Sequence, residues 1–316
     1  MTDNLKNSRV VYALGETVLD LVSNGDFSLQ AVPGGSVLNA SVSLGRMGTA
    51  IYLISEFGDD KAGDLIENFL KYNTVKTDYC IRNIQRKTSL ALAFLDKAKN
   101  ASYSFYHDTP EKLPITSIPV FSKEDILLFG SFYAVKPERR EFILSVLRCA
   151  VEAKSIIYYD LNIRKAHSAE LDECMTTYMN NISVSTIVKG SDEDFRNIFG
   201  IKDPENVYEK IRHYCNMLII TAGGKPLHVF TPGFVKTYKI PAIRPVSTIG
   251  AGDNFNAGFI YGISTTDISS KQIEKLTEAQ MDRIIGCGLA FATEACLSPE
   301  NYVKGNFEPD FWMKYI

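Results

Sequence analysis

The sequence lacks the features that mark membrane proteins and nucleic-acid-binding proteins. Its longest apolar stretches span only a few residues, as at 126–129, whereas a membrane-spanning helix needs roughly 18 or more. Lysine and arginine total 34 against 37 aspartates and glutamates, for a net charge of −3. No basic block is present that would neutralise a row of phosphates. We therefore expect a small-molecule partner, with no nucleic acid and no membrane.

Cysteine pairs and secretion signals are missing as well. The six cysteines are scattered without a C-x-x-C pair, and the four histidines form no local pair of metal ligands. This spacing suits reduced thiols better than a disulfide framework or a zinc site. The first residues include no apolar segment typical of a signal peptide. We expect a cytoplasmic protein.

Several signatures of nucleotide binding and catalysis do not occur. There is no G-x-x-x-x-G-K-[ST] loop, because Gly224-Lys225 is followed by Pro226. No G-x-G-x-x-G follows the first expected strand, and neither G-x-S-x-G nor H-E-x-x-H is found. These absences exclude a P-loop enzyme and count against a dinucleotide dehydrogenase, an α/β-hydrolase and a zincin.

Short β-branched and aliphatic runs alternate with helix-length segments. The expected strands are 9–15, 51–57, 125–130, 155–161, 186–189 and 217–221, and the expected helices are 36–47, 60–70, 137–153 and 169–181. Near-continuous apolar strands in this order are typical of a doubly wound α/β domain, in which helices flank both faces of a mainly parallel sheet. We expect residues 1–316 to form one such domain, with its ligand beyond the carboxyl ends of the strands.

One region departs from this alternation. Segments 88–96 and 101–108 have strand alternation and are joined by a polar turn, which predicts a hairpin. Segment 20–32 also lacks helical periodicity. Together these segments predict a small β-sheet, inserted at about 17–33 and 88–110, that covers a cleft as a lid. The alternative is a hairpin on the edge of the main sheet.

The most informative segment is Gly250-Ala251-Gly252-Asp253, which leads directly into an apolar helix. Small residues at a helix start leave backbone N–H groups open to an anion. Asp253 would lie where a phosphoryl group is held and would accept a proton from an attacking hydroxyl. The helix dipole and the amides should keep it ionised at neutral pH. The alternative is an ordinary first-turn acid after a glycine loop.

Two further segments carry candidate sugar-binding residues. The loop Gly34-Gly35 precedes a helix that bears Asn39 about one turn in, and an amide there would both donate to and accept from a polyol. Asp20 follows the first strand, where a carboxylate would accept two hydroxyl hydrogen bonds. Each of these residues alone is a weak signal.

Together these segments resemble a known family. Residues 247–253, Ser-Thr-Ile-Gly-Ala-Gly-Asp, are similar to the D-T-x-G-A-G-D signature of the ribokinase-like, or PfkB-type, carbohydrate kinases. Gly34-Gly35 with Asn39 resembles the family's sugar-binding signature. Residues 221–224 resemble its T-x-G nucleotide turn, and residues 160–164 resemble its D-x-N-x-R segment. The four segments keep the family's order, and the resemblance spans residues 9 to about 295.

The resemblance implies an ATP-dependent sugar kinase that uses Mg²⁺, with the ribokinase-like fold. Asp253 would be the base, and the amides of Gly250, Ala251 and Gly252 would stabilise the transferring phosphoryl group. The residues implied to bind the sugar are Asp20, Gly34, Gly35, Asn39 and Arg164. Those implied to bind the nucleotide are Asn162, Thr221, Gly223 and Gly224. The lid would exclude water and would also offer a surface for a homodimer.

The identity of the sugar is less constrained. Gly15-Glu16 and segment 160–164 look like the fructokinase and 2-keto-3-deoxygluconate kinase branches. Arg164 suits either a substrate carboxylate or a nucleotide phosphate. We predict fructose. The alternatives are 2-keto-3-deoxygluconate, a nucleoside, and a non-catalytic protein that binds sugar or nucleotide.

Two positions depart from the family pattern. Ser247 replaces the first aspartate of the signature, whose carboxylate helps to hold a monovalent cation in relatives, so activation by K⁺ stays open. Ser191 and Asp194 stand where the family has its N-x-x-E segment, which orders Mg²⁺ and its waters. We expect Asp194 to act on the metal through water. The alternatives are an altered discrimination between phosphates, and Glu193 as the relevant acid.

Overall fold

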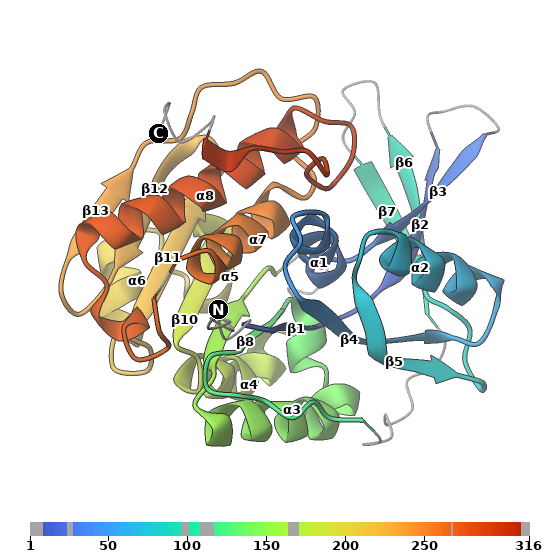
Figure 1. The fold of residues 1–316 in the computed structure, drawn as a ribbon, viewed down its shortest axis with the longest axis horizontal. Helices are drawn as coiled ribbons and strands as arrows, with labels where there is room; N and C mark the ends of the chain where they lie inside the picture. Colours follow the sequence, from blue (N-terminus) through green and yellow to red (C-terminus); the bar gives the residue numbers. More distant parts are fainter. Residues whose placement is uncertain are drawn as a thin grey trace, which may run out of the picture.

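The computed structural model describes residues 9–23, 28–95, 101–107, 117–163, 171–266 and 268–310. Its main sheet has nine strands in the order β13-β12-β11-β10-β9-β8-β1-β4-β5 (Figure 1). The strands from β11 to β5 run parallel, and β12 and β13 are antiparallel additions at one edge. The main-sheet strands are β1 (Val11–Leu14), β4 (Ile51–Gly58), β5 (Lys76–Asn83), β8 (Ile126–Gly130), β9 (Ile156–Asp160), β10 (Ile187–Ser191), β11 (Met217–Ala222), β12 (Lys225–Phe230) and β13 (Val235–Tyr238). The predicted doubly wound α/β fold is confirmed.

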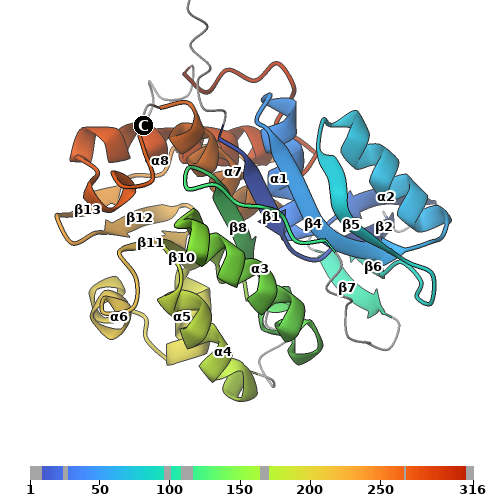
Figure 2. The same cartoon turned by 60° about the horizontal axis from the view of Figure 1, so that its bottom comes forward.

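Helices cover both faces of this sheet. They are α1 (Ser36–Arg46), α2 (Lys61–Tyr72), α3 (Arg140–Ala153), α4 (Leu171–Ser183), α5 (Asp192–Phe199), α6 (Pro204–Ile211), α7 (Ala251–Ser264) and α8 (Glu278–Cys296). Helices α1, α2, α7 and α8 lie on one face and α3 to α6 on the other (Figure 2). Alternate strand residues enter two separate apolar clusters, one shared with each group of helices. This division follows from the two-residue period of strands buried on both faces. No helix within the described ranges is long and apolar enough to cross a bilayer.

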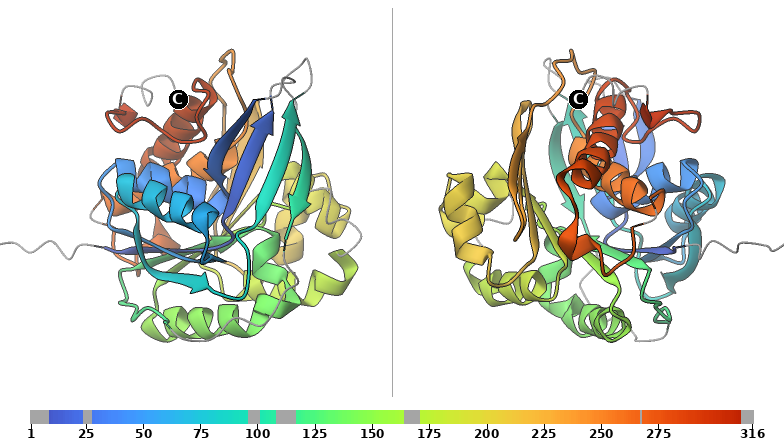
Figure 3. Two further views of the ribbon diagram at one scale, coloured as in Figure 1. Left: turned by 90° about the vertical axis from the view of Figure 1, so that its right-hand side faces the viewer. Right: turned by 60° about the vertical axis from the view of Figure 1, so that its left-hand side comes forward.

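A second, smaller sheet stands apart from the main one (Figure 3). It consists of β2 (Val18–Ser23), β3 (Leu29–Gly34), β6 (Leu90–Leu95) and β7 (Ala101–Tyr106), in the order β3-β2-β6-β7. The hairpin β6–β7 pairs with β2 and not with the main sheet, so the alternative of an edge hairpin is wrong. The predicted small β-sheet is therefore present, and we refer to these four strands as the small sheet.

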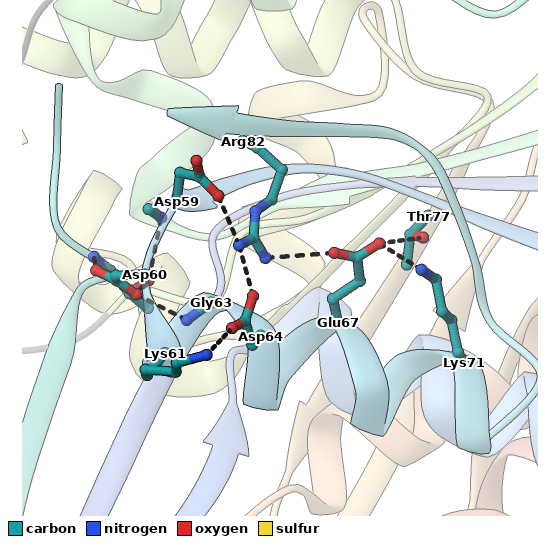
Figure 4. A network of polar contacts seen from close by, with 11 residues as sticks. Asp59, Asp60, Lys61, Gly63, Asp64, Glu67, Lys71, Thr77 and Arg82 are labelled. Atoms are coloured by element: carbon teal, nitrogen blue, oxygen red, sulfur yellow. Dashed lines mark hydrogen bonds and ion pairs between the residues drawn. The ribbon is translucent and has the colours of Figure 1, made fainter. Parts of the chain in front are cut away.

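Polar contacts attach the small sheet to the body of the protein. Asp60 caps the start of α2 and also accepts hydrogen bonds from the backbone N–H (2.9 Å) and the hydroxyl (2.7 Å) of Thr88, just before β6. Beside it, Arg82 donates to Asp59, Asp64 and Glu67 (Figure 4). These contacts fix the segment that leads from the main sheet into the small sheet.

Close packing between α7 and α8 sets the position of the predicted anion-binding helix. A Cβ built at Gly258 would collide with the backbone of Cys287, and one at Gly262 would crowd Ile284. Glycine at these positions lets the two helix backbones approach closely. Helix α7 is thereby held with its N-terminus at the carboxyl ends of β9 and β10, where a ligand is expected in a doubly wound sheet.

Candidate active site

A cavity of about 320 Å³ lies between the small sheet and the N-terminus of α7. Of the residues predicted to form the site, the cavity brings together Asp20, Gly35, Asn39, Asn162, Gly250, Gly252 and Asp253. These residues come from the small sheet, from α1, from the end of β9 and from α7. Parts of the chain more than 200 residues apart thus form one cavity, of a size that suits a small ligand.

The glycine loop before α7 has the backbone geometry that the sequence predicted. Gly250 is the N-cap residue, with φ of 79°, and Ala251 and Gly252 form the first turn. Asn254 secures the loop, because its Nδ2 donates to the carbonyls of Gly250 and Asn301, both at 2.8 Å. In the first turn of α7 the N–H of Ala251 already donates to the carbonyl of Thr248 at 3.3 Å, whereas those of Gly252 and Asp253 have no partner among the described residues. Open N–H groups at a helix start favour an anion.

Asp253 is held by two residues of α1. The hydroxyl of Ser36 donates to its Oδ1 at 2.6 Å, and the Nδ2 of Asn39 donates to its Oδ2 at 2.8 Å. Burial raises the pKa of Asp253, and these two hydrogen bonds oppose that rise without cancelling it. The sequence argument from the helix dipole left this burial out. The carboxylate is therefore fixed in position and more basic than a free aspartate.

The other predicted sugar-binding residues surround the same space. The Oδ1 of Asn39 is buried and accepts no hydrogen bond from the described residues. Asp20 points toward Gly34 so closely that a Cβ there would collide with its carboxylate. Gly35 has φ of 124°, and a side chain at this position would collide with the carbonyl of Glu16. The two glycines thus leave room for Asp20 and for the start of α1.

The cavity wall includes strained backbone. Ser131 and Asn162 follow β8 and β9, line the cavity, and have φ of 56° and 37°. The N–H of Ser131 donates to the carbonyl of Asp160 at 2.9 Å. Non-glycine residues with positive φ are uncommon and tend to cluster at functional sites, where the surrounding structure holds them. The carboxyl ends of these two strands are the part of the fold expected to contact ligand.

A buried ion pair forms the floor of the cavity. Lys189, in the middle of β10, donates from Nζ to Oδ1 of Asp160 at 3.0 Å, and both side chains are nearly fully buried. Asn256 of α7 donates to Oδ2 of Asp160 at 2.6 Å and accepts from the hydroxyl of Tyr158 at 3.0 Å. This chain of contacts joins β9, β10 and α7 beneath the glycine loop.

The wall on the side of the small sheet is polar at one end and aromatic at the other. Lys136 donates to Glu16 at 3.0 Å, and the Nδ1 of His107 lies 4.0 Å from the same Glu16 oxygen. Phe105, stacked on His107 at 5.7 Å, and Phe132 complete this wall. The wall therefore offers an ion pair without net charge, in which Lys136 is a donor and Glu16 an acceptor, together with the faces of two aromatic rings.

Asp194 has protein partners on both oxygens. Its Oδ1 accepts from the N–H of Ile163 at 2.7 Å, and its Oδ2 accepts from the N–H (2.6 Å) and the hydroxyl (2.8 Å) of Ser191, forming a capping box at the start of α5. It does not line the cavity. This geometry gives no support to the expected contact with Mg²⁺ through water. No cluster of three metal-ligating side chains occurs in the described ranges.

The remaining predicted residues lie apart from the cavity or outside the described residues. Thr221 lies near the end of β11, and Gly223 and Gly224 form the turn between β11 and β12. None of the three lines the cavity. The hydroxyl of Ser247 accepts from the N–H of Ile249 at 3.1 Å and so stabilises its own loop. Arg164 lies outside the described residues.

Sequence reasoning assigned no role to three residues that the structure places in the site: Ser36, Lys136 and Lys189. Lys189 carried a signal, since a cation near the carboxyl end of a buried apolar strand points to a ligand or a partner charge. Ser36 follows the predicted glycine loop directly. Lys136 lies between two short 3₁₀ helices and had no recognisable pattern.

Comparisons with known proteins find relatives along most of the chain. Fructokinase from Escherichia coli is 26% identical over 282 residues, which cover 88% of this chain and 90% of the relative. Fructokinase-2 from Oryza sativa subsp. japonica is 24% identical over 285 residues, which cover 85% of this chain and 84% of the relative. Both alignments extend over most of each chain.

Solved structures share the fold. Fructokinase from Vibrio cholerae O395, bound to fructose, ADP and a calcium ion, superposes with a TM-score of 0.85 at 21% identity, covering 98% of this chain and 99% of that one. Aminoimidazole riboside kinase from Salmonella enterica gives a TM-score of 0.81 at 21% identity, with 97% and 99% covered. The family model described as pfkB family carbohydrate kinase matches residues 4–300. The chain belongs to the pfkB family of carbohydrate kinases and is a phosphotransferase that acts on a sugar hydroxyl.

Proposed function

We propose that this protein is a fructokinase that transfers the γ-phosphoryl group of ATP to fructose. The observation that carries the proposal is the fixed, buried carboxylate of Asp253 at the N-terminus of α7, in one cavity with Asp20 and Asn39. A base, an anion-binding helix start and polyol-binding groups are the parts that phosphoryl transfer to a sugar requires.

The reaction follows from this arrangement. The acceptor hydroxyl gives its proton to Asp253 while its oxygen forms a bond to the γ-phosphorus. The bond from that phosphorus to the bridging oxygen breaks, and ADP leaves with the electron pair. Of the three amides predicted for this role, those of Gly250 and Gly252 stabilise the charge on the transferring group, whereas that of Ala251 already donates to the carbonyl of Thr248. Asp20 and the free Oδ1 of Asn39 accept hydrogen bonds from other hydroxyls of the sugar.

The charges of the cavity wall favour a neutral sugar over a keto-deoxy acid. A carboxylate substrate needs a cation that is available to it. On the outer wall Lys136 is already paired with Glu16 at 3.0 Å, and Lys189 lies against Gly252, where we place the phosphoryl group. Asp20, Glu16 and Asp253 would repel an added carboxylate, whereas fructose supplies hydroxyls for both members of the Glu16–Lys136 pair. The fructokinase relatives support the same choice.

The metal fits best as part of the nucleotide complex. Mg²⁺ is usually held by one or two carboxylates together with substrate phosphates, and the described residues offer no dedicated cluster of metal ligands. The ion would neutralise phosphate oxygens. We place the nucleotide phosphates at the start of α7 beside Asn162, and the rest of the nucleotide toward the turn with Thr221, Gly223 and Gly224. Dependence on K⁺ stays a question for experiment because Ser247 supplies no carboxylate.

A second candidate acceptor is a riboside. The observation that favours it is the pair of aromatic residues, Phe105 and Phe132, on the cavity wall. Aromatic faces stack on a planar ring, and a neutral riboside also supplies hydroxyls for Asp20 and Asn39. The structural neighbour from Salmonella is a riboside kinase. A direct comparison of acceptors separates this candidate from fructose.

The small sheet has two different faces. Val18, Asp20 and Phe105 line the cavity from one face, so we propose that it acts as a lid that keeps water from the phosphoryl group. On the opposite face Leu29, Phe94 and Tyr106 are each more than half exposed. We propose that this apolar outer face binds a second copy of the chain, since exposed apolar patches mark interaction surfaces.

The first test measures ADP release from Mg-ATP with fructose, ribose, 2-keto-3-deoxygluconate, fructose 6-phosphate and adenosine, each with and without K⁺. We expect turnover with fructose. Turnover with adenosine alone would favour the riboside, and binding without any turnover would indicate a non-catalytic protein.

The second test replaces the proposed base. We expect Asp253→Asn to lower kcat by about 10³-fold while the affinity for the sugar changes little, because only the proton acceptor is lost. A wild-type rate in Asp253→Asn would contradict the mechanism.

The pH dependence tests the environment of Asp253. Because burial raises its pKa, kcat/KM should begin to fall, as the pH is lowered, at a higher pH than for a free aspartate. Ser36→Ala removes a hydrogen bond to the ionised form, so the pKa should rise further and move this acid limb up by about one pH unit. Ser41→Ala is the control, since its hydroxyl bonds only to its own helix. An acid limb that stays in place, or moves down, counts against Asp253 as the titrating base.

The capping role of Asp194 predicts a loss of stability without any metal. Asp194→Asn replaces one acceptor oxygen with a donor that faces a backbone N–H. We expect a loss of about 1–3 kcal/mol and a fall of several degrees in Tm, measured in EDTA without nucleotide. The control is Glu205→Gln, which changes an exposed acid in the first turn of α6 and should leave Tm nearly unchanged. If Asp194→Asn lowered Tm only in the presence of Mg-nucleotide, the metal role would be restored.

Association through the small sheet predicts a mass that depends on one exposed residue. The wild-type protein should have the mass of a dimer in light scattering after size exclusion, and Phe94→Glu should give a monomer because it places a charge in an apolar contact. Tyr72→Glu, at an aromatic residue on α2 that is more exposed than Phe94 (85% against 52%), is the control that should remain dimeric. A wild-type monomer at micromolar concentration would refute this interface.

A further inference from the structure

Lys189 is a buried cation that the proposed mechanism leaves unused. Its side chain is 5% exposed, yet it lines the cavity that holds Asp253 and the glycine loop. A Cβ built at Gly252 would lie 3.2 Å from its Nζ, so the ammonium lies against the open side of Gly252. The positive charge is therefore next to the place where the helix start binds an anion.

The contacts of the ammonium are incomplete. A lysine ammonium has three protons to donate, and among the described residues its only hydrogen bond goes to Asp160. Burial lowers the pKa of Lys189, but the carboxylates of Asp160, Asp194 and Asp253 outweigh burial and raise it overall, so the group stays charged. A buried, charged group with unused donors next to an anion site points to an anionic ligand.

Asp160 holds the ammonium in a fixed position. One oxygen binds Lys189, and the other accepts from Asn256 at 2.6 Å, which in turn is held by the hydroxyl of Tyr158 at 3.0 Å. A donor that is already in place when charge develops costs no reorganisation during the reaction. A purely structural role does not explain why a charged pair is present here, because a buried ion pair often stabilises a protein no more than an apolar pair of the same size.

We propose that Lys189 is a catalytic residue whose ammonium contacts the transferring phosphoryl group and stabilises its negative charge, with Asp160 as the residue that positions it. The inference rests on the proposed function of Asp253 and the glycine loop. In the reaction the ammonium keeps its proton, and the proton of the acceptor hydroxyl still goes to Asp253.

The main test uses a neutral replacement of the pair. Lys189→Met alone would leave Asp160 buried without a counter-charge, so Lys189→Met with Asp160→Asn removes both charges together and should retain a Tm near that of the wild type. We expect kcat to fall more than tenfold, toward the 10²- to 10³-fold loss typical of one oxyanion donor, with the acceptor KM nearly unchanged. The control is Lys236→Met, which removes a lysine of β13 that is ion-paired with Asp282 and does not line the cavity. A loss of less than tenfold in the folded double variant overturns the proposal.

The single variant Asp160→Asn supplies a test that a structural role would not reproduce. Burial lowers the pKa of Lys189, and without the carboxylate of Asp160 only Asp194 and Asp253 oppose this effect. The ammonium should therefore lose its proton at a lower pH. We expect kcat to fall on the alkaline side, in a pH range where the wild-type rate is flat. An unchanged alkaline limb in a folded Asp160→Asn protein counts against catalysis by Lys189, and this test remains available if the double variant does not fold.

A measurement of nucleotide affinity tests the role of Lys189 independently of which sugar is the acceptor. Calorimetric titration without acceptor should show that the double variant weakens binding of Mg-ATP about tenfold and binding of Mg-ADP much less, because only ATP carries the transferring group. If the wild type phosphorylates no acceptor, the proposed function fails, and this difference still decides the role of Lys189. Equal affinities of wild type and double variant for ATP would refute the contact.

Discussion

The site depends on the contact between α1 and α7 at Asp253. Ser36 and Asn39 donate to its two oxygens at 2.6 and 2.8 Å, across 217 and 214 residues of sequence. This contact fixes the carboxylate relative to the glycine loop, which belongs to the same helix, and relative to Asp20, which lies beside the glycines that precede α1. It needs the close approach of α7 to α8 at Gly258, since any shift of α7 would separate the carboxylate from both donors. Hydrogen bonds to an ionised group are among the stronger ones in proteins, so the two donors also limit how far burial raises the pKa of Asp253.

Local patterns identified most of the fold and much of the site. The strands from β1 to β11 that are buried on both faces had continuous apolar runs, and α1 ended before Gly48, which has φ of 76° as expected of a C-terminal glycine. The antiparallel strands β12 and β13 and the edge strand β5 were not predicted, because edge strands are partly exposed and mix polar with apolar residues. The loop at Gly250 could be predicted because its chemistry depends on backbone freedom, which glycine reveals directly.

The rest of the site depends on distant parts of the chain and could not be predicted from local pattern. The partners of Asp194 are a nearby serine and the N–H of Ile163 on another strand end, so a metal role and a capping role look alike in sequence. Lys136 reaches Glu16 across 120 residues. The burial that raises the pKa of Asp253 is likewise a property of the assembled cavity, and an argument from its own helix alone gave only the opposing effect of the dipole.

The charges of the cavity are arranged by depth, and this order explains why both lysines are paired. Glu16 and Lys136 form an ion pair on the outer wall beside the small sheet. Because the two charges cancel, this pair can bind the hydroxyls of a polyol and repels neither the nucleotide nor the sugar. Asp160 and Lys189 lie on the floor, where the pair is nearly fully buried and costs desolvation energy. Between them lies Asp253, which in the proposed mechanism accepts a proton next to a group that is itself negative. A cation fixed below the glycine loop lowers the electrostatic cost of bringing a phosphoryl group close to that carboxylate. Stability alone gives little reason to keep such a buried pair, whereas the proposed role of Lys189 in stabilising charge during the reaction does.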